Sequence, residues 1–476
     1  MSAAPRDFIY QRITRDLSKA IRDGVYGIHE RMPSLRRVAD HYQVSLATVV
    51  QAFACMEAEG LIAARPKSGY YVLPSTKIHL ETPVLTRPSN LPTAVNVGQL
   101  ALSLVNESKS LNLVKLGAAV PEVSLLPVRN LSRILAGSAR QHWRDASVYE
   151  LAQGVVPLRR QIARLMRQAG CRCTPEDIVI TNGCLEALAL SLRVVARAGD
   201  TIAVESPTYF GVLQVMESLG MKALEIATDA ETGIDLEALE TSLTSRKVRA
   251  CILQPNHSNP MGSRMPDQAK QRVVALLARL GIPLLEDDVY GPLSYRQPRP
   301  KAAKAWDNDG NVLLCSSFSK TIAPGYRIGW VYSEKYREQL LYQKFLSNIS
   351  TASLPQIALA TFLARGAYGR ALRQQVQVYR QRMDQLRHWV YDYFPVGTRV
   401  SQPTGGFVCW LELPADVDCM ALYEKAFARR IAISPGVLFC ARGQYRHHIR
   451  MSCGAVEGER MRRAIKQLGG LVEGCR

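Results

Sequence analysis

Near the start of the chain, apolar residues recur at the spacing of amphipathic helices. Residues 7–24, 34–42 and 46–59 each place their apolar side chains on one helical face. Two short apolar runs follow within residues 61–73, and a polar, glycine-containing turn separates them. This pattern predicts three helices followed by a β-hairpin.

A short turn joins the second and third of these helices. Ser45 stands at the expected N-cap of the third helix, because a serine hydroxyl accepts hydrogen bonds from the first N–H groups of a helix. Three helices with a short turn between the last two, followed by a hairpin, are typical of a winged helix-turn-helix. Such a domain places the start of its third helix in the DNA major groove.

From about residue 117 the pattern changes, and strands alternate with helices. This alternation predicts an α/β fold with a mixed, mostly parallel sheet that has helices on both faces. Ligands of such sheets bind beyond the carboxyl ends of the strands. A smaller α+β lobe is predicted over residues 396–476. The predicted strands cover residues 178–180, 201–204, 222–227, 248–253, 282–286, 312–315 and 328–332.

A segment rich in proline, threonine and serine separates the two patterns. Residues 74–95 show no clear hydrophobic period, which predicts a semi-stiff linker. The predicted organisation is therefore a winged helix-turn-helix over residues 1–73, a linker over 74–95 and an α/β domain over 96–476.

The net charge indicates an anionic partner without locating it. The chain has 476 residues and a formal charge of +19. Residues 1–75 hold only ten lysines and arginines against seven acidic residues, so most of the excess lies elsewhere. Such a charge is compatible with a polyanion or an anionic ligand.

Other features of composition narrow the class of protein. No run approaches the roughly 18 apolar residues of a membrane span, and residues 1–24 lack the apolar core of a signal peptide. The 11 cysteines are scattered without CxxC spacing, so neither a metal site nor a disulfide framework is expected. We expect a cytoplasmic protein that does not bind a membrane.

Lys320 is the first candidate for chemistry. It follows the apolar run 312–315 in a turn of small and hydroxylic residues, and Arg327 stands seven residues later. A lysine whose pKa is lowered by such surroundings can act as an imine-forming nucleophile, and the arginine can bind a phosphate. A single lysine after a strand is more often an ordinary surface residue, so the other motifs decide between the two interpretations.

Four further motifs follow predicted strands. Gly183 lies where residues 181–184 begin a helix, whose free N–H groups and dipole favour a phosphate. Tyr209, Asn259 and the pair of Asp287 with Tyr290 occupy the ends of later strands. Each has an ordinary alternative: Tyr209 as a core residue, for instance, or the acidic residues as a solvated turn.

The first domain resembles the winged-helix domain of GntR-type bacterial regulators. The residues that carry the resemblance are 31–39, 44–49 and 57–62. It implies that the domain binds double-stranded DNA. The residues that it places in contact with DNA are Arg36, Ser45, Thr48, Lys67 and Gly69.

The region of about residues 115–470 resembles the fold-type I aminotransferases, which depend on pyridoxal 5'-phosphate (PLP). The motifs described above occur in the order that this family shows. The resemblance implies that Lys320 forms a Schiff base with PLP and that Asp287 keeps the pyridine nitrogen protonated. It also implies that Arg450 binds the carboxylate of an amino compound. The implied cofactor-binding residues are Gly183, Cys184, Tyr209, Asn259, Asp287, Tyr290, Ser317, Lys320, Arg327 and, from the partner subunit of a homodimer, Tyr149.

Together the two domains resemble the MocR subfamily of GntR regulators. The resemblance implies a transcription regulator that binds an operator with two half-sites and senses PLP or an amino compound through aldimine formation. Such a protein would be cytoplasmic and associated with the nucleoid. The alternative is an active PLP-dependent aminotransferase with an accessory DNA-binding domain. A residual transaminase half-reaction fits either hypothesis, and the sequence identifies neither the effector, the operon nor the sign of regulation.

Overall fold

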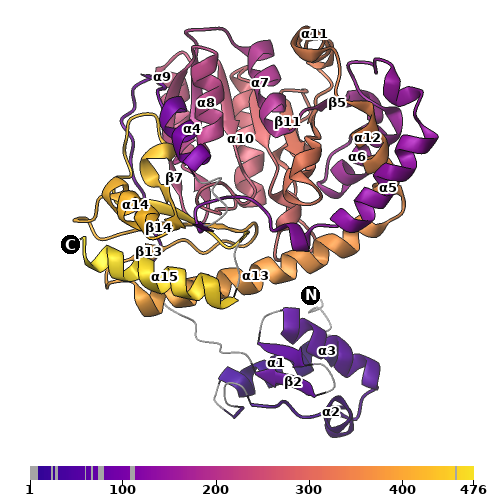
Figure 1. Ribbon diagram of the computed structural model, residues 1–476, viewed down its shortest axis with the longest axis vertical. Helices are drawn as coiled ribbons and strands as arrows, with labels where there is room; N and C mark the ends of the chain where they lie inside the picture. The colour runs from indigo at the N-terminus through magenta and orange to yellow at the C-terminus, as the bar shows by residue number, and fades with distance from the viewer. Residues whose placement is uncertain are drawn as a thin grey trace, which may run out of the picture. The chain divides into compact units, whose positions relative to one another are not determined.

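The computed structural model shows two compact units, Met1–His79 and Leu80–Arg476. We call them the N-terminal unit and the large unit (Figure 1). The structure describes residues 9–22, 25–26, 30–58, 61–65, 68–72, 80–107, 113–455 and 458–475.

The N-terminal unit has the predicted three helices and hairpin. Helices α1 (Ile9–Arg22), α2 (Leu35–Tyr42) and α3 (Leu46–Ala58) precede the antiparallel strands β1 (Ile62–Arg65) and β2 (Gly69–Val72). The prediction of a winged helix-turn-helix is confirmed. The last residues of the predicted first and third helices lie outside the described residues.

Local chemistry explains where the helices of this unit begin and end. Ser34 Oγ accepts a hydrogen bond from the Arg37 N–H at 3.3 Å, which caps α2. Gln43 ends the helix in the left-handed conformation, with φ of +51°. The fully buried Ile13, Val49 and Phe53 form the core between α1 and α3. The turn is therefore fixed by a cap at one side and packing at the other.

The large unit is built on a nine-stranded sheet with the order β3-β7-β6-β9-β10-β11-β12-β5, to which β8 is added beside β7. Neighbours from β7 to β11 run parallel, whereas β12 is antiparallel to both β11 and β5. The sheet is thus mixed and mostly parallel, as predicted. The strands are β3 (Thr93–Ala94), β5 (Ile178–Thr181), β6 (Thr201–Ser206), β7 (Lys222–Asp229), β8 (Gly233–Ile234), β9 (Ala250–Leu253), β10 (Leu284–Asp287), β11 (Val312–Ser317) and β12 (Gly329–Tyr332).

Helices cover both faces of this sheet (Figure 1). Alternate residues of each strand point to opposite faces, so Val204 packs with α7 and α8 while its neighbour Ala203 packs with α9 and α10. A further apolar core joins α5, α6 and α12 to the β5 edge. The helices of this part are α4 (Gly98–Glu107), α5 (Val128–Gln141), α6 (Val156–Gln168), α7 (Cys184–Val195), α8 (Phe210–Ser218), α9 (Leu236–Ser245), α10 (Asp267–Arg279), α11 (Arg337–Asn348) and α12 (Ser353–Ala364).

The long helix α13 leads into a smaller lobe with the predicted α+β composition. Its four-stranded antiparallel sheet has the order β13-β14-β17-β16. A separate short strand of the lobe, β15, pairs in parallel with β4. The elements are β4 (Val114–Lys115), α13 (Ala367–Tyr393), β13 (Arg399–Val400), β14 (Val408–Glu412), α14 (Cys419–Ala428), β15 (Ile431–Ala432), β16 (Ser434–Pro435), β17 (His448–Ser452) and α15 (Gly458–Glu473).

The predicted linker of residues 74–95 differs from the structure from Leu80 onward. Val84 N donates to Glu412 Oε2 at 2.7 Å, and Arg399 Nε lies 2.9 Å from Glu81 Oε2. Farther along, β3 pairs with β7. The segment has no hydrophobic period because it adds to surfaces that other elements have already built. Residues 80–95 therefore belong to the large unit, and residues 73–79 lie outside the described residues.

Three findings concern membranes, metals and disulfides. None of the described helices is long and apolar enough to cross a membrane. The described residues contain no group of three or more His, Cys, Asp or Glu side chains arranged to hold a metal ion. The cysteines are all free thiols, including Cys171 and Cys173, which are buried.

Candidate functional site

The candidate residues of the large unit meet at one edge of the sheet. Asp287 ends β10 and Ser317 ends β11, and these two strands are parallel neighbours. Gly183 follows β5, and Tyr209 follows β6. Because these strands point the same way, their carboxyl ends lie at one edge. The structure thus brings together motifs that are far apart in the sequence.

Lys320 lies in the turn after β11, with a half-buried side chain. Its Nζ donates to the carbonyl oxygen of Ala119 at 2.8 Å and lies 5.9 Å from the centre of the Tyr290 ring. Burial, helped by the charge of Arg450, lowers the pKa of Lys320 to about 8, although Asp287 opposes the shift. A substantial fraction of this amine is therefore neutral near physiological pH, as a nucleophile must be.

Asp287 is a buried carboxylate without a cationic partner among the described residues. Its Oδ2 accepts from Gln254 Nε2 at 2.9 Å, and its Oδ1 accepts from Val289 N at 3.1 Å. The Cys184 thiol lies 3.6 Å from Oδ1. Burial raises the pKa of Asp287 to about 6. A ligand with a protonated ring nitrogen would favour the ionised form of this group.

Two of the site residues predicted from the sequence keep a buried polar atom that has no hydrogen-bond partner among the described residues. The atoms are Tyr290 Oη and Arg450 Nε. Leaving such a group unsatisfied costs about 1–3 kcal/mol, so native proteins seldom retain one without a reason. Burial also raises the pKa of Tyr290, which keeps its hydroxyl as a donor. A bound molecule with acceptor oxygens would satisfy both atoms.

Arg450 lies on β17 and is 3% exposed. Its Nη1 donates to Asn259 Oδ1 at 2.8 Å, and its Nη2 donates to Gly117 O at 2.5 Å and Ser434 Oγ at 3.2 Å. Its guanidinium lies 5.0 Å from the centre of the Phe439 ring. The described residues thus give it neutral partners only, and a carboxylate ligand would be the first anion that it meets.

The contact between Arg450 and Asn259 fixes the orientation of the asparagine amide. Oδ1 of Asn259 accepts the hydrogen bond from Arg450. Its Nδ2 is then the donor that remains for a ligand. This orientation would suit the expected role of Asn259 as a cofactor-binding residue.

A cradle for an anion forms where α7 begins. Gly183 is its N-cap, with φ of +85°, and a Cβ atom there would collide with Arg327 Nη2. Arg327 Nη2 donates to the Asn182 carbonyl at 3.0 Å, and Nη1 lies 3.5 Å from Ser319 Oγ. A guanidinium beside the N–H groups of a helix N-terminus is suited to a phosphate. Ser317, which is 5% exposed, is the N-cap of the turn Phe318–Lys320 that contains Ser319.

The remaining candidates differ in where the structure places them. Tyr209 is the N-cap residue of α8 and is half-buried, with its ring 4.9 Å from that of Phe210. Tyr149 is 83% exposed. The structure therefore does not bring Tyr149 into the site of its own chain. Its predicted role depends on a second copy.

His257 is buried beside the site but is not a base. It is 1% exposed, and neither ring nitrogen has a partner among the described residues. Burial and the charge of Arg264 lower the pKa of His257 to about 3, so the ring is neutral. A Cβ atom on Gly405 would lie 2.5 Å from the imidazole, so the ring fills space against this glycine.

Gln254 and Glu205 are residues of the site that the sequence reasoning missed. Gln254 donates to Asp287 and also accepts from the Asn259 N–H at 2.5 Å, so one side chain positions two candidate ligand contacts. Glu205 Oε2 accepts from Gln254 N at 2.8 Å, and burial raises the pKa of this acid to about 7. Gln254 directly follows β9, as the other candidates follow their strands, and this position was the available signal.

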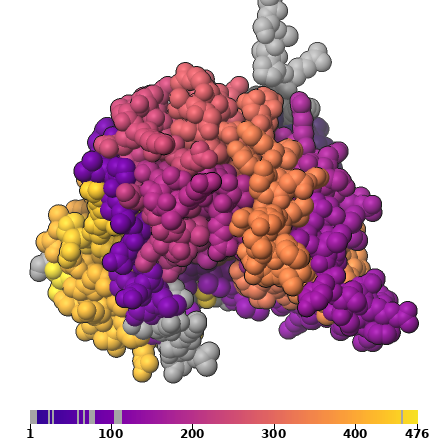
Figure 2. Space-filling model, turned by 90° about the horizontal axis from the view of Figure 1, so that it is seen from above, coloured from indigo at the N-terminus to yellow at the C-terminus, as the bar shows by residue number. Residues whose placement is uncertain are grey.

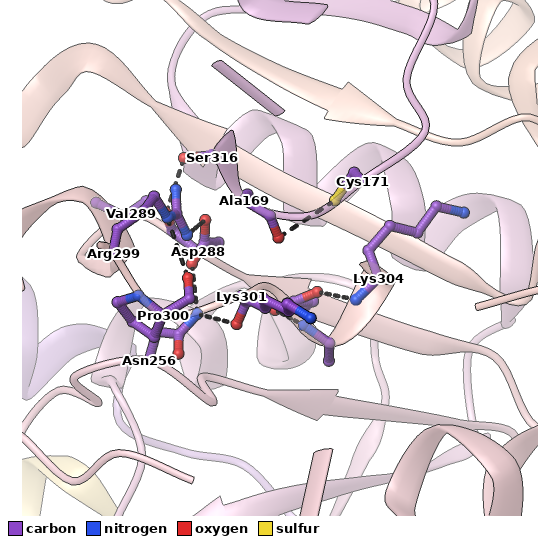
Figure 3. Close-up of polar contacts among 12 residues, drawn as sticks. Ala169, Cys171, Asn256, Asp288, Val289, Arg299, Pro300, Lys301, Lys304 and Ser316 are labelled. Atoms are coloured by element: carbon purple, nitrogen blue, oxygen red, sulfur yellow. Dashed lines mark hydrogen bonds and ion pairs between the residues drawn. The ribbon is translucent and has the colours of Figure 1, made fainter. Parts of the chain in front are cut away.

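Asp288, the neighbour of the candidate Asp287, is bound to other protein groups. Arg299 Nη2 lies 2.7 Å from Asp288 Oδ2, and Asn256 Nδ2 donates to Oδ1 at 3.0 Å (Figure 3). The Ser316 hydroxyl donates to the Asp288 carbonyl at 3.0 Å. Figure 3 shows these groups converging on one buried acid. Asp288 is thus fully used in holding β10, β11 and the loops together.

The N-terminal unit presents its candidates on the surface. Ser45 Oγ accepts from Thr48 N at 3.2 Å and lies 2.9 Å from Thr48 Oγ1, which caps α3. Arg36 and Ser45 are exposed, whereas Thr48 is half-buried. Gly69 has φ of +107° and lies against the Arg31 side chain. Lys67 lies outside the described residues. The start of α3 is therefore open to a large partner.

Comparison with known proteins agrees with both halves. Residues 9–72 match the family of bacterial regulatory proteins called gntR, and residues 132–468 match class I and II aminotransferases. The chain is 38% identical over 463 residues to the uncharacterized HTH-type transcriptional regulator YjiR of Escherichia coli, covering 97% of this chain and 98% of the relative. It is 36% identical over 464 residues to YdcR of the same organism, covering 98% and 99%.

The large unit also resembles solved aminotransferases. LysN from Thermus thermophilus, an alpha-aminoadipate aminotransferase complexed with N-(5'-phosphopyridoxyl)-L-leucine, matches with a TM-score of 0.73 and 25% identity, covering 78% of this chain and 97% of LysN. The aminotransferase match and this phosphopyridoxyl complex indicate PLP as the cofactor. The chain therefore belongs to the gntR family of bacterial regulatory proteins, in the MocR-like group that joins a winged helix to a class I and II aminotransferase domain.

Proposed function

We propose that this regulator changes its affinity for DNA when PLP and an amino compound occupy the large unit. The observation that carries the proposal is the pair of orphaned buried atoms, Tyr290 Oη and Arg450 Nε, beside a lysine of lowered pKa. Both atoms belong to residues at the sheet edge, where a bound ligand would supply the missing partners. The winged helix on the same chain gives this site a DNA-binding output.

The residues at the strand ends fit PLP. When bound, PLP supplies an aldehyde that condenses with a primary amine, releasing water, and a ring that draws electrons from the product. Lys320 would supply the amine, Asp287 a carboxylate for the ring nitrogen, and Tyr290 and Asn259 donors for the ring oxygen. Gly183, Cys184, Ser317 and Arg327 would hold the phosphate, and Tyr209 would contact the cofactor ring.

Arg450 selects an effector that has a carboxylate. Gly117 and Ser434 offer its guanidinium only neutral oxygens, and a carboxylate can replace them in a bidentate, charge-assisted pair. An amino compound with a carboxylate would compete with Lys320 for the cofactor and with Gly117 for Arg450. Both exchanges alter contacts that hold the site in its present arrangement.

A short path connects Arg450 to the start of the large unit. Arg450 pairs in register with Trp410 on β14, and the same strand ends at Glu412. Glu412 accepts the hydrogen bond from Val84 in the segment of residues 80–86, which we call the strap. Pro83 and Thr86 of the strap also line a small cavity with Trp410. We propose that displacement of β17 by the effector moves the strap, from which the chain continues toward the N-terminal unit.

A homodimer is part of the proposal. Exposed apolar side chains gather in two segments, one around Tyr149 and one on α11, and such residues are usual at subunit interfaces. Tyr149 would then contact the phosphate in the site of the partner subunit. Two winged helices per dimer fit an operator with two half-sites, and the DNA partner places the protein at the nucleoid in the cytoplasm. The exposed residues are Trp143, Val148, Tyr149, Leu151, Tyr342, Phe345, Leu346 and Ile349.

Selection of DNA by the full-length protein tests this function. A pool of random duplexes is enriched on the PLP-loaded protein at moderate salt, and the selected duplex is used in fluorescence anisotropy. We expect a sequence with two related half-sites and an affinity that changes when PLP is removed. Failure to enrich any sequence, or an affinity insensitive to PLP, would contradict the proposal.

Amino-group transfer is the second candidate function. It is favoured by the same lowered pKa of Lys320 and by a complete set of candidate residues. Multiple turnovers between amino acids and keto acids, with no selected DNA sequence, would support it over regulation. A slow single half-reaction is compatible with a regulator, because the cofactor itself supplies most of the chemistry.

A further inference from the structure

Two helices of the large unit carry charged side chains of one kind only. All the charged residues of α5 and α6 are arginines. One of them, Arg159, is buried and donates to the Gly154 and Pro175 carbonyls. The other six are exposed, and we call them the arginine face. They are Arg129, Arg133 and Arg140 of α5 and Arg160, Arg164 and Arg167 of α6.

The spacing of these arginines places them on one side of each helix. On α5 they lie four and then seven residues apart, and on α6 four and then three. With 3.6 residues per turn, each set forms a single stripe. The stripe on α5 from Arg129 to Arg140 is about 16 Å long, at 1.5 Å per residue. A DNA duplex carries roughly nine phosphate charges over that length.

The opposite sides of both helices are fixed in the core. Leu131 and Ile134 of α5 and Ile162 and Met166 of α6 belong to one buried cluster with residues of α12. In Figure 2 this part of the chain (purple, at the right) forms an exposed flank of the large unit. The arginine face is therefore held on a rigid support, and no other described element covers it.

In the part of the chain that the structure describes, salt bridges do not neutralise the six side chains of the arginine face. None of the six forms an ion pair among the described residues. Within the face, Arg133 Nε donates to the Arg129 carbonyl oxygen at 3.4 Å. Some exposed arginines elsewhere in the unit do form ion pairs, as Arg279 does with Glu240 and Arg446 with Asp418. The arginine face is thus a local cluster of six exposed cations without a salt bridge among the described residues.

We propose that the arginine face binds the phosphate backbone of the DNA that the winged helix recognises. The proposal rests on the proposed function only in that the chain binds DNA. Arginine forks match phosphate oxygens, and contacts of this kind add affinity without adding sequence information. The N-terminal unit is poor in net charge, so backbone contacts from the large unit would supply much of the electrostatic attraction. DNA flanking the half-sites is the expected occupant.

Neutral variants of the full-length, PLP-loaded protein test this surface. The variant Arg160→Gln/Arg164→Gln/Arg167→Gln removes the stripe on α6, and Arg197→Gln/Lys247→Gln/Arg272→Gln removes three exposed, unpaired charges elsewhere as a matched control. DNA affinity is measured against salt, with the selected duplex alone and with about 20 added base pairs on each side, more than the length of the stripe. The slope of log K against log[salt] falls by about 0.9 for each phosphate that the protein no longer neutralises.

We expect the α6 variant to lose slope on the long duplex and to match the parent on the short one. The control should match the parent on both, and the charge-retaining variant Arg160→Lys/Arg164→Lys/Arg167→Lys should keep most of the slope. An α6 variant with the parent's slope on the long duplex overturns the proposal. A change of oligomeric state in the α6 variant would also overturn the proposal, because it would show that this face is a subunit interface. If the parent selects no DNA sequence, a random duplex of the long length replaces the selected one. A slope that falls in the α6 variant on that duplex then supports the arginine face while the proposed regulation fails.

Discussion

The two units present their functional groups in opposite ways. At the start of α3, Ser45 is exposed, and its hydroxyl is hydrogen-bonded to its own helix. Among the described residues, this surface has no buried, unsatisfied group that needs a small molecule as a partner. At the sheet edge, Tyr290 and Arg450 are buried with unsatisfied atoms, and Lys320 and Asp287 have shifted pKa values. The hydrogen bonds at the start of α3 are satisfied without DNA, whereas the site at the sheet edge keeps unsatisfied atoms without its ligand.

The difference reflects the size of the partner. A DNA duplex is large and carries its own charges and bound water. A DNA-binding domain therefore needs only an exposed helix whose shape fits the groove. A small molecule must be enclosed, and the enclosing groups lose water whether or not the ligand is there. Unpartnered polar atoms that lie together with a lysine and an aspartate of shifted pKa at the sheet edge therefore support the small-molecule site.

Loss of Lys320 should have the largest effect, because no other candidate residue of the site carries a primary amine. In Lys320→Ala the covalent bond to PLP cannot form, and the visible absorbance of the lysine-linked cofactor should vanish. The exposed Lys335 provides the matched control Lys335→Ala, which should keep the parent spectrum. Circular dichroism should show both variants folded. A parent-like spectrum in Lys320→Ala would refute the assignment of the amine.

Changes in the N-terminal unit should act on DNA binding alone. Arg36→Ala removes an exposed cation on α2, and we expect about a ten- to hundredfold weaker complex with the selected duplex, the range of one good contact. The PLP spectrum should stay the same, because the two units have separate cores. Arg12→Ala, an exposed arginine of α1 near Asp16, is the control. Equal losses in both variants would argue against a specific role for Arg36.

Arg450 should separate binding of the cofactor from response to the effector. Arg450→Gln should still bind PLP, whereas the spectral response to amino acids should need at least about tenfold higher concentrations, since a charge-assisted pair contributes about 1.5–3 kcal/mol. Amines without a carboxylate should act equally on parent and variant. The same response of both proteins to amino acids would rule out a carboxylate at this position.

The strap should affect communication and leave both binding reactions intact. Arg399 bonds Glu81 of the strap at 2.9 Å and Glu412 of β14 at 3.1 Å, so Arg399→Gln removes both ion pairs. We expect a few-fold smaller change of DNA affinity on adding the effector, with parent-like binding of PLP and of DNA alone. Arg462→Gln, which breaks a pair with Glu459 on α15, is the control. If the effector changes the DNA affinity of Arg399→Gln as much as that of the parent, the strap does not connect the two sites.

The smallest effect concerns pH. The pKa of Lys320 is lowered to about 8, so the reactive neutral amine of the PLP-free protein should appear as pH rises through 8, below the ordinary lysine pKa near 10.4. The charge of Arg450 contributes to this lowering, and Arg450→Gln should move the midpoint upward. The rate of PLP attachment against pH measures both. A midpoint near the ordinary lysine value in the parent protein would show that the lysine is solvated.

The sequence predicted the parts of the molecule that local signals determine. Caps at Ser34 and Ser45 fixed the helices of the N-terminal unit, and strand ends placed Asp287 and Lys320 correctly. Gln254 was missed because its role depends on the register between β9 and β10, which sets it beside Asp287. No local pattern reports a contact between neighbouring strands.

The strap was missed for a related reason. Its residues have no period of their own, and Val84 and Glu81 are held by Glu412 and Arg399, more than 300 positions later in the sequence. Proline-rich composition predicts only the lack of regular structure. Whether such a segment hangs free or lies on a surface depends on partners that the surrounding residues do not reveal.

The most direct test follows the PLP spectrum and the DNA complex in one titration. The full-length protein with PLP and labelled selected duplex receives a series of amino compounds, and absorbance and anisotropy are read together. We predict that one class of amine changes both signals with the same midpoint and shifts DNA affinity about 5- to 150-fold, the usual range of coupling between sites. A spectrum that changes fully while DNA affinity stays constant for every amine would contradict the account.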